Sequence, residues 1–250
     1  MSKKTYFASD FHLGVDARLT SKEREKQIVR WLDMAARDAD AIYLLGDIFD
    51  FWFEYKTVIP KGYTRLLGKL AELTDGGLPI YFFTGNHDMW MFQYFEEELG
   101  IKTYRAPIER KIGNKNFLIG HGDGLGPGDH GYKFIKKIFS NQLCQWAFAR
   151  LHPNLGLGLG NYFSGTSRHN NIESATFLGE DQEWLCQYAN ELIEHKPIDY
   201  FVFGHRHIPI DHLLKNQKSR YINLGEWLNH CSYAIFDGND ISLKYFEKKM

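Results

Sequence analysis

Apolar runs alternate with amphipathic stretches over the first part of the chain. Runs with the length and composition of buried strands occupy 5–9, 41–45 and 78–84. Between them, apolar side chains recur at helical spacing after Ser21 and again over 63–73. The order strand, helix, strand, helix, strand predicts a sheet covered by helices, with right-handed crossovers where its strands are parallel.

Shorter strand patterns replace this alternation further along the chain. Strands are predicted at 102–105, 108–112 and 116–119, with Gly113-Asn114-Lys115 as a hairpin turn. A second group of strands is predicted near the C-terminus, at 200–203, 219–223, 231–236 and 241–246. Together these elements predict an α/β fold in which two packed mixed sheets are flanked by helices.

A helical segment separates the two groups of strands. Helices are predicted at 129–151 and 173–195, interrupted by the glycine-rich stretch 155–160. The stretch from Tyr132 to Leu151 is aromatic, basic and amphipathic. Such a helix can dock on its own core, lie at a membrane interface or line an acyl tunnel. We therefore expect one domain over 1–250 that carries a helical insertion.

Composition narrows the classes of function. The 44% hydrophobic and 24% charged residues are typical of a soluble globular protein, and a formal net charge of -1 gives no overall field toward nucleic acid. No apolar run reaches the roughly 18 residues that span a bilayer. Three widely spaced cysteines and no signal-peptide pattern favour a reducing, cytoplasmic location. The sequence implies no obligate protein partner.

Polar clusters follow five of the predicted strands, at the ends where open sheets present their ligands. Each cluster alone could be a capping or turn sequence. Taken together, and with two histidines at i, i+2 in the last of them, they indicate a metal site. The clusters are Asp10-Phe11-His12, Gly46-Asp47-Ile48-Phe49-Asp50, Gly85-Asn86-His87-Asp88, Gly120-His121-Gly122-Asp123 and Gly204-His205-Arg206-His207.

The side chains in these clusters supply nitrogen and oxygen ligands and no sulfur. Imidazole combined with carboxylate suits Mn, Fe or Zn, and we expect manganese. If Asp47 bridges two divalent cations, each cation receives four protein ligands and keeps open positions for water and substrate. Two such cations clamp a phosphoryl group and activate water. The predicted ligands are Asp10, His12, Asp47, Asn86, His121, His205 and His207.

The ordered motifs D-x-H, G-D-x-x-D, G-N-H-D, G-H and G-H-x-H resemble those of the calcineurin-like metallophosphoesterase superfamily. The resemblance implies a four-layer αββα sandwich with phosphoesterase activity. It also implies that His87 protonates the leaving group or binds phosphate, with Asp88 orienting its ring. The implied ligand sets are Asp10, His12, Asp47 and His207 for one cation, and Asp47, Asn86, His121 and His205 for the other.

Within that superfamily the chain is similar to the UDP-2,3-diacylglucosamine pyrophosphohydrolases of lipid A synthesis, on the sequences 9–13, 46–52 and 224–227. This similarity implies a helical lid at 125–198 that holds acyl chains, and a protein that works at the inner face of the cytoplasmic membrane. Three residues of the segment are candidate substrate contacts. Asp129 and Tyr132 match the start of the family's lid, and the Arg168 guanidinium offers a fork for phosphate.

His87 departs from the pattern of the best-known members of that family, which have arginine at this position. Arginine stabilises charge without giving up a proton, whereas histidine can also protonate an alkoxide. Two substrate classes therefore stay open. One is UDP-2,3-diacylglucosamine, cleaved to UMP and the diacylated sugar 1-phosphate, and the other is water-soluble phosphodiesters or monoesters of nucleotides and other small molecules. A non-catalytic binding module would not need the complete ligand set, and nucleic-acid cleavage is disfavoured by the net charge.

Overall fold

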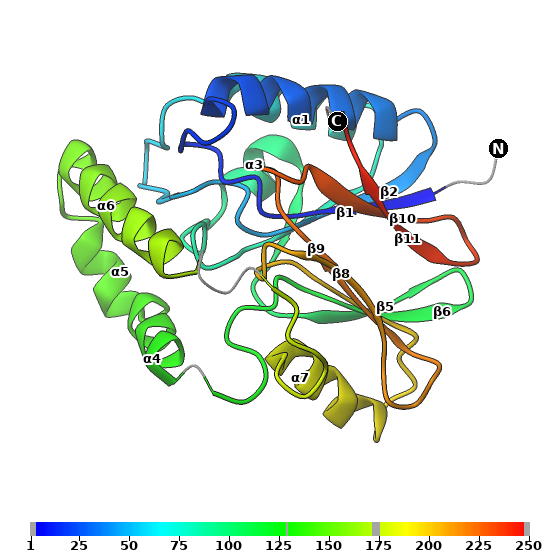
Figure 1. Cartoon of the computed structure of the whole chain (residues 1–250). Coiled ribbons are helices and arrows are strands. Elements are labelled where there is room, and N and C mark those ends of the chain that lie inside the picture. Colours follow the sequence, from blue (N-terminus) through cyan, green and yellow to red (C-terminus); the bar gives the residue numbers. More distant parts are fainter. Residues whose placement is uncertain (1–3, 129, 172–175, 248–250) are drawn as a thin grey trace.

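The computed structural model describes residues 4–128, 130–171 and 176–247, without the side chains of 166–171. It contains two mixed sheets, as the sequence predicts (Figure 1). The first has the order β11-β10-β1-β2-β3-β4, with β1 to β4 parallel and β10 and β11 antiparallel. Its strands are β1 Lys4–Ala8, β2 Ala39–Leu45, β3 Ile80–Phe83, β4 Lys102–Tyr104, β10 Ser232–Phe236 and β11 Ile241–Tyr245.

The second sheet has the order β5-β6-β7-β9-β8, with parallel central strands and an antiparallel strand at each edge. Side chains from the facing surfaces of both sheets interlock, including the stacked rings of Phe7 and Phe117, whose centroids lie 5.9 Å apart. The core of the sandwich therefore lies between the sheets. The strands are β5 Ile108–Ile112, β6 Lys115–Ile119, β7 Tyr200–Phe203, β8 Pro209–Leu213 and β9 Arg220–Leu224.

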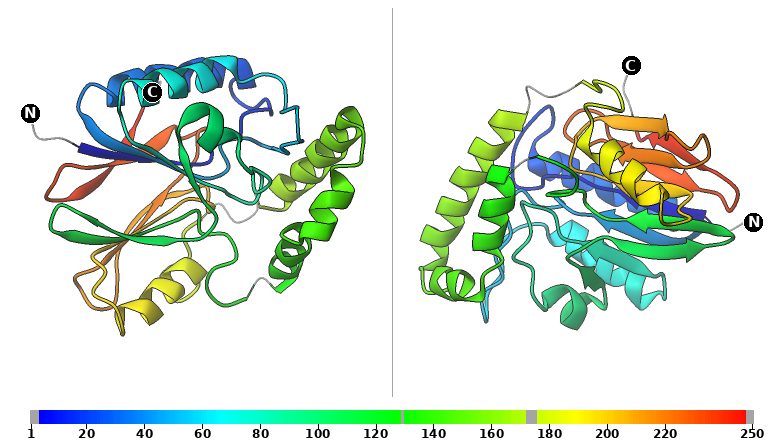
Figure 2. Two further views of the ribbon diagram at one scale, coloured as in Figure 1. Left: turned by 180° about the vertical axis from the view of Figure 1, so that it is seen from behind. Right: turned by 90° about the horizontal axis from the view of Figure 1, so that it is seen from below.

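Helices cover the outer face of each sheet (Figure 2). Helices α1 Ser21–Ala35, α2 Thr64–Asp75 and α3 Tyr94–Leu99 pack on the first sheet, and α7 Trp184–Ile193 packs on the second. Helix α1 begins where predicted because Thr20 and Glu23 form a capping box. The layers are thus helix, sheet, sheet, helix, which confirms the predicted sandwich.

Three further helices, α4 His130–Phe139, α5 Gln142–Phe148 and α6 Pro153–Asn171, stand beside the sandwich (Figures 1 and 2). Helices α4 and α5 bury no side chain. They are attached through rings of the core, where Phe148 lies 4.7 Å from both Phe53 and Trp90 between centroids. The extent of the predicted insertion, 125–198, stays a prediction, and its final helix α7 belongs to the layer on the second sheet.

Two predictions for this segment are wrong. The glycine-rich stretch 155–160 does not interrupt a helix, since it lies inside α6. The helix predicted at 173–195 is only Trp184–Ile193, and part of its predicted start, 173–175, lies outside the described residues. Strand β8 and helix α3 were not predicted. In the part of the chain that the structure describes, no helix is long and apolar enough to cross a bilayer.

Candidate metal centre

The predicted ligands come from loops that follow strands of both sheets. Asp10 and His12 follow β1, Asp47 follows β2, and Asn86 follows β3 in the first sheet. His121 follows β6, and His205 and His207 follow β7 in the second. Because these strands run parallel within each sheet, their carboxyl ends meet at one edge of the sandwich. The fold therefore brings all seven residues to one place.

The ligand atoms form two groups that share Asp47. The first group is Asp10, His12, Asp47 and His207, and the second is Asp47, His121 and His205, with the atoms of each group within 4.8 Å of one another. Oδ2 of Asp47 lies 3.9 Å from Nε2 of His12 and 3.3 Å from Nε2 of His121. Asp47 is thus placed between the groups, as expected for a bridging carboxylate.

Asn86 completes the second group. Its side-chain oxygen lies 3.2 Å from Nε2 of His121 and 2.9 Å from Nδ1 of His205. Each sheet therefore contributes to each group, because His207 from the second sheet also lies 3.0 Å from Nε2 of His12 in the first. The two sheets must be packed in their final register before either group exists.

Backbone strain is concentrated at these residues. Asp10, His12, Asp47, His205 and His207 all have positive φ, between 45° and 70°. This left-handed region is uncommon for residues other than glycine and costs of order 1–3 kcal/mol at each position. Such strain persists where the surrounding structure imposes it, and it is commonly found at functional sites.

Arg24 of α1 holds the first of the strained loops. Its guanidinium is fully buried and donates hydrogen bonds to the carbonyl oxygens of Phe11 at 2.8 Å, His12 at 2.6 Å and Val15 at 2.6 Å. It also donates to the carbonyl oxygen of Leu19 at 3.2 Å, and a rigid planar donor that contacts four carbonyls fixes the path of the loop. Arg24 therefore positions the ligand His12 from behind.

The donor atoms fit divalent cations. Oδ2 of Asp47 is buried and lacks a hydrogen-bond partner among the described residues. A buried polar atom without a partner is costly and calls for an explanation such as a bound ion. A set of carboxylate, amide and imidazole donors without sulfur suits the borderline divalent metals. The residues present therefore match the pair of divalent cations that the motifs imply.

The electrostatics of the centre favour cation binding. Burial alone would raise the pKa of Asp47, but the surrounding imidazoles, His121 first, lower it well below its usual range. Burial lowers the pKa of His205 to about 4 and that of His12 well below its ordinary value, so both imidazoles are neutral at neutral pH. Ionised carboxylate and neutral imidazole are the forms that bind metals.

The raised pKa of His121 also indicates that the centre favours positive charge. Burial alone would lower its pKa, but the carboxylate of Asp47 raises it to about 10. The site therefore attracts positive charge strongly enough to hold a proton on this ring. A cation that binds there takes the place of the proton.

Comparison with known proteins places this geometry in a family. The model of the family described as calcineurin-like phosphoesterase matches residues 3–209. The chain belongs to the calcineurin-like phosphoesterase family. Membership confirms the predicted superfamily, the αββα sandwich and a metal-dependent hydrolase with divalent metals.

Three curated relatives carry the same name, UDP-2,3-diacylglucosamine hydrolase. The protein from Porphyromonas gingivalis is 36% identical, over 99% of this chain and 99% of its own length. The protein from Aeromonas salmonicida is 28% identical, over 92% of this chain and 89% of its own. The protein from Shewanella baltica strain OS185 is 27% identical, over 96% of each chain. This phosphoesterase therefore aligns with all three over nearly its whole length.

His87 lies against the metal centre, as predicted, but the groups that orient its ring differ from the prediction. Its Nδ1 lies 2.9 Å from the carbonyl oxygen of Asp50 and 2.5 Å from Oγ of Ser164 in α6. The Asp88 carboxylate instead accepts backbone N–H bonds from Gly85 at 2.7 Å and Ile48 at 2.8 Å. Asp88 thus ties two ligand loops together, and Asp50 and Ser164 hold the ring.

The predicted substrate contacts are only partly described. Tyr132 lies on α4 and donates a hydrogen bond to Oδ2 of Asp123 at 2.5 Å, and its ring centroid lies 6.2 Å from that of His205. Asp129 lies outside the described residues, and Arg168 lies on α6 with its side chain outside the description. The structure therefore brings one of the three to the edge of the centre.

Three side chains near the centre were given no role on the basis of the sequence. Asp50 is the second aspartate of the G-D-x-x-D motif, and Asp123 follows His121, so the motifs themselves carried a signal for both. Ser164 carried none. Its hydroxyl lies 2.9 Å from Oδ2 of Asp50, 114 residues away in sequence, and that contact depends on where α6 packs.

Proposed function

We propose that this protein hydrolyses the pyrophosphate of UDP-2,3-diacylglucosamine to UMP and 2,3-diacylglucosamine 1-phosphate, as a step of lipid A synthesis. The observation that carries the proposal is a large apolar surface on α4, α5 and α6 beside a metal centre fit for phosphoester chemistry. The full-length similarity to hydrolases named for this substrate supports it. The exposed apolar side chains of these helices are Phe134, Ile135, Ile138, Phe139, Leu143, Trp146, Leu155, Leu159, Tyr162 and Phe163.

We assign the metal ligands by the two groups of atoms. Asp10, His12, Asp47 and His207 would hold one divalent cation, and Asp47, Asn86, His121 and His205 the other. Manganese is our proposal for both, with iron and zinc as the alternatives that the same donors accept. When bound, the pair of cations supplies a clamp for the phosphoryl oxygens and a more acidic water.

The residues of the chain then handle the leaving group. Water attacks the phosphorus of the UMP unit and loses one proton to solvent, the bond from that phosphorus to the bridging oxygen breaks, and the sugar 1-phosphate leaves with the electron pair. A carbonyl oxygen only accepts hydrogen bonds, so the contact with Asp50 places a proton on Nδ1 of His87. Burial lowers the pKa of His87, so the negative charge of a bound substrate phosphate would have to restore the second proton before Nε2 could donate it to the departing oxygen. Ser164 and Asp50 keep the ring in that orientation.

The apolar surface gives the acyl chains a place outside water. Acyl chains cannot remain in solvent without cost, and contact with the aromatic and aliphatic side chains of α4 to α6 removes that apolar area from water. The same surface would let the enzyme reach its substrate at the cytoplasmic face of the membrane. We propose peripheral binding there, with no nucleic acid and no obligate protein partner.

Release of UMP tests the function directly. Purified protein loaded with manganese is incubated with UDP-2,3-diacylglucosamine in detergent, and UMP is measured by chromatography. We expect UMP and the diacylated sugar 1-phosphate in equal amounts. The Asp47→Ala variant is the negative control. Cleavage of bis(p-nitrophenyl) phosphate without any release of UMP would exclude the proposal and leave a phosphodiesterase of small soluble esters, the alternative that His87 favours.

A further inference from the structure

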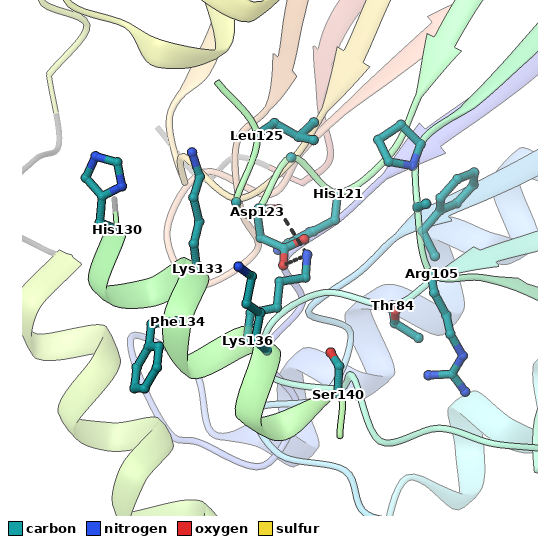
Figure 3. Close-up of a pocket in the computed structure, with 16 residues that line it drawn as sticks. Thr84, Arg105, His121, Asp123, Leu125, His130, Lys133, Phe134, Lys136 and Ser140 are labelled. Carbon is teal, nitrogen blue, oxygen red and sulfur yellow. Dashed lines mark hydrogen bonds and ion pairs between the residues drawn. The ribbon is translucent and has the colours of Figure 1, made fainter. Parts of the chain in front are cut away.

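A cavity of about 680 Å³ lies beside the metal centre, between α4 and the loop after β4 (Figure 3). His121 and Gly122 of the centre form part of its wall. Its size falls within the range of about 300–1,000 Å³ that is usual for cavities that bind small molecules. A ligand in it would therefore lie next to the candidate metal ligand His121.

Most of the charged side chains that line this cavity are cationic. Arg105 lines the side next to β4, and Lys133, Lys136 and Lys137 line the side formed by α4. Among the described residues, Asp123 is the one carboxylate that lines it. The whole chain has a formal net charge of -1, so this excess of positive charge is local. Local cations of this kind attract an anionic ligand.

Two of the three lysines bind other groups of the protein, and the third is free to bind a ligand. Lys136 forms a 2.5 Å ion pair with Asp123, and Lys133 donates to the carbonyl oxygen of Gly126 at 2.5 Å. Within the described part of the chain, Lys137 has no hydrogen bond or ion pair. Helix α4 is thus docked on the loop that carries His121, and Lys137 remains to bind a ligand.

A second cavity of about 340 Å³ adjoins the first and shares Arg105, Asp123 and Lys136 with it. It also reaches the metal centre, at Gly85. Its other polar lining is uncharged and comes from the residue after β3, the residue after α4, and α5. Hydroxyl and amide groups of this kind can donate to and accept from a ribose and a pyrimidine base. The uncharged polar residues are Thr84, Ser140, Gln142 and Gln145.

We infer that these joined cavities bind the nucleotide half of the substrate, with the phosphate at the lysines and the nucleoside at the amides. The inference rests on the proposed function for the identity of the nucleotide. Burying charged groups against acyl chains would be costly, so the cationic cavity is unsuited to the lipid half. The acyl chains then lie on the apolar side chains of α5 and α6, and the scissile bond lies between the two regions.

Direct binding of three small ligands to the manganese-loaded protein tests this assignment by calorimetry. The ligands are UMP, inorganic phosphate and glucosamine 1-phosphate. We expect Lys137→Gln to raise the Kd for UMP and for phosphate about tenfold, the loss of one charge-assisted hydrogen bond. Gln142→Ala should raise the Kd for UMP alone. Lys22→Gln, an exposed lysine of α1 on the far side of the first sheet, is the matched control and should change none of them.

Two outcomes would overturn the inference. One is a Kd for UMP that is the same in wild type, Lys137→Gln and Gln142→Ala. The other is that these substitutions weaken glucosamine 1-phosphate and spare UMP, which would assign the cavities to the sugar phosphate. Binding is measured without turnover. Failure to hydrolyse UDP-2,3-diacylglucosamine would thus remove the proposed function and leave a nucleotide site that passes this test.

Discussion

At the scale of single residues, Asp47 connects the two halves of the metal centre. Its Oδ2 is the buried carboxylate atom common to both ligand groups, and its Oδ1 accepts the backbone N–H of His87 at 2.9 Å. One side chain therefore sets the spacing of the two proposed cation sites and the position of His87, the proposed acid. No other carboxylate in the described part of the centre belongs to both ligand groups.

Replacing Asp47 with alanine should remove metal and activity together. We expect Asp47→Ala to lower kcat by about a thousandfold or more, since the ligand of both cations is lost. Elemental analysis and release of UMP measure the two effects. In the comparison variant His87→Ala, metal content should stay at the wild-type level while turnover slows. A loss of both metals from His87→Ala would contradict its placement beside the ligands.

Ser164 should act on the rate through the ring of His87. Ser164→Ala removes the hydroxyl that lies 2.5 Å from Nδ1, and we expect kcat to fall about tenfold, a fraction of what a general acid contributes. KM and metal content should change less, because neither the lysine-lined cavity nor the ligands include this residue. Ser164→Thr keeps a hydroxyl and should restore most of kcat. An equal loss in both variants would indicate a packing role instead.

The sequence indicated where the candidate ligands meet better than it indicated the groups that support them. Asp10, Asp47 and His207 lie in short motifs directly after strands, so chain order alone placed them at one sheet edge. Arg24 and Ser164 act from helices, and their contacts depend on how those helices pack. Local sequence patterns carry no information on which side chains a packed helix will contact. The prediction that Asp88 orients His87 failed for this reason.

At the scale of elements, one mistaken prediction and one strand that was not predicted have packing causes. Glycine usually weakens a helix, but Gly156 and Gly160 lie in α6 where the Tyr55 hydroxyl and the Phe51 ring leave no room for a Cβ. These glycines let the helix approach the core closely. Strand β8 begins with Pro209, which argues against a central strand but is tolerated at the sheet edge that β8 occupies.

The loop after β9 should make stability sensitive to acid through Glu226. Burial alone would raise the pKa of this carboxyl, but hydrogen bonds led by His230 lower it below its ordinary value of 4.5. Its oxygens also accept the backbone N–H groups of Leu228 and of Asn229, the latter at 2.9 Å. The ionised form is therefore favoured by folding. Its stabilisation is present above pH 4.5 and is lost as the pH falls through the lowered pKa.

The variant Glu226→Gln isolates that contribution. At pH 7 it should lower the free energy of unfolding by about 2 kcal/mol, since a buried charged acceptor is replaced by a neutral one. At a pH below the folded pKa the two proteins should differ much less, because Glu226 is then protonated in both states. Urea unfolding at both pH values measures the difference. A deficit that stays constant with pH would show that the charge is not responsible.

At the scale of the whole molecule, two surfaces of opposite character flank one metal centre. The cavities beside His121 are lined by cations and amides, and the surface of α4 to α6 presents exposed aliphatic and aromatic side chains. A substrate with a charged nucleotide at one end and acyl chains at the other matches this division. The bond that joins the two parts then lies where the ligand loops of both sheets meet.

The apolar surface should also bind membranes. Leu143 and Trp146 of α5 are 70% and 56% exposed, next to the lysines of α4. Buried apolar area and attraction to anionic lipids together give interfacial binding. We expect the protein to cosediment with phosphatidylglycerol vesicles, and the pair Leu143→Glu and Trp146→Glu to weaken binding at least tenfold because two new charges would face the acyl region. The matched control is Leu213→Glu, at an exposed position on the edge strand β8, and it should bind vesicles like wild type.

Equal binding of vesicles by wild type, the double variant and the control would mean that α5 does not contact the lipid.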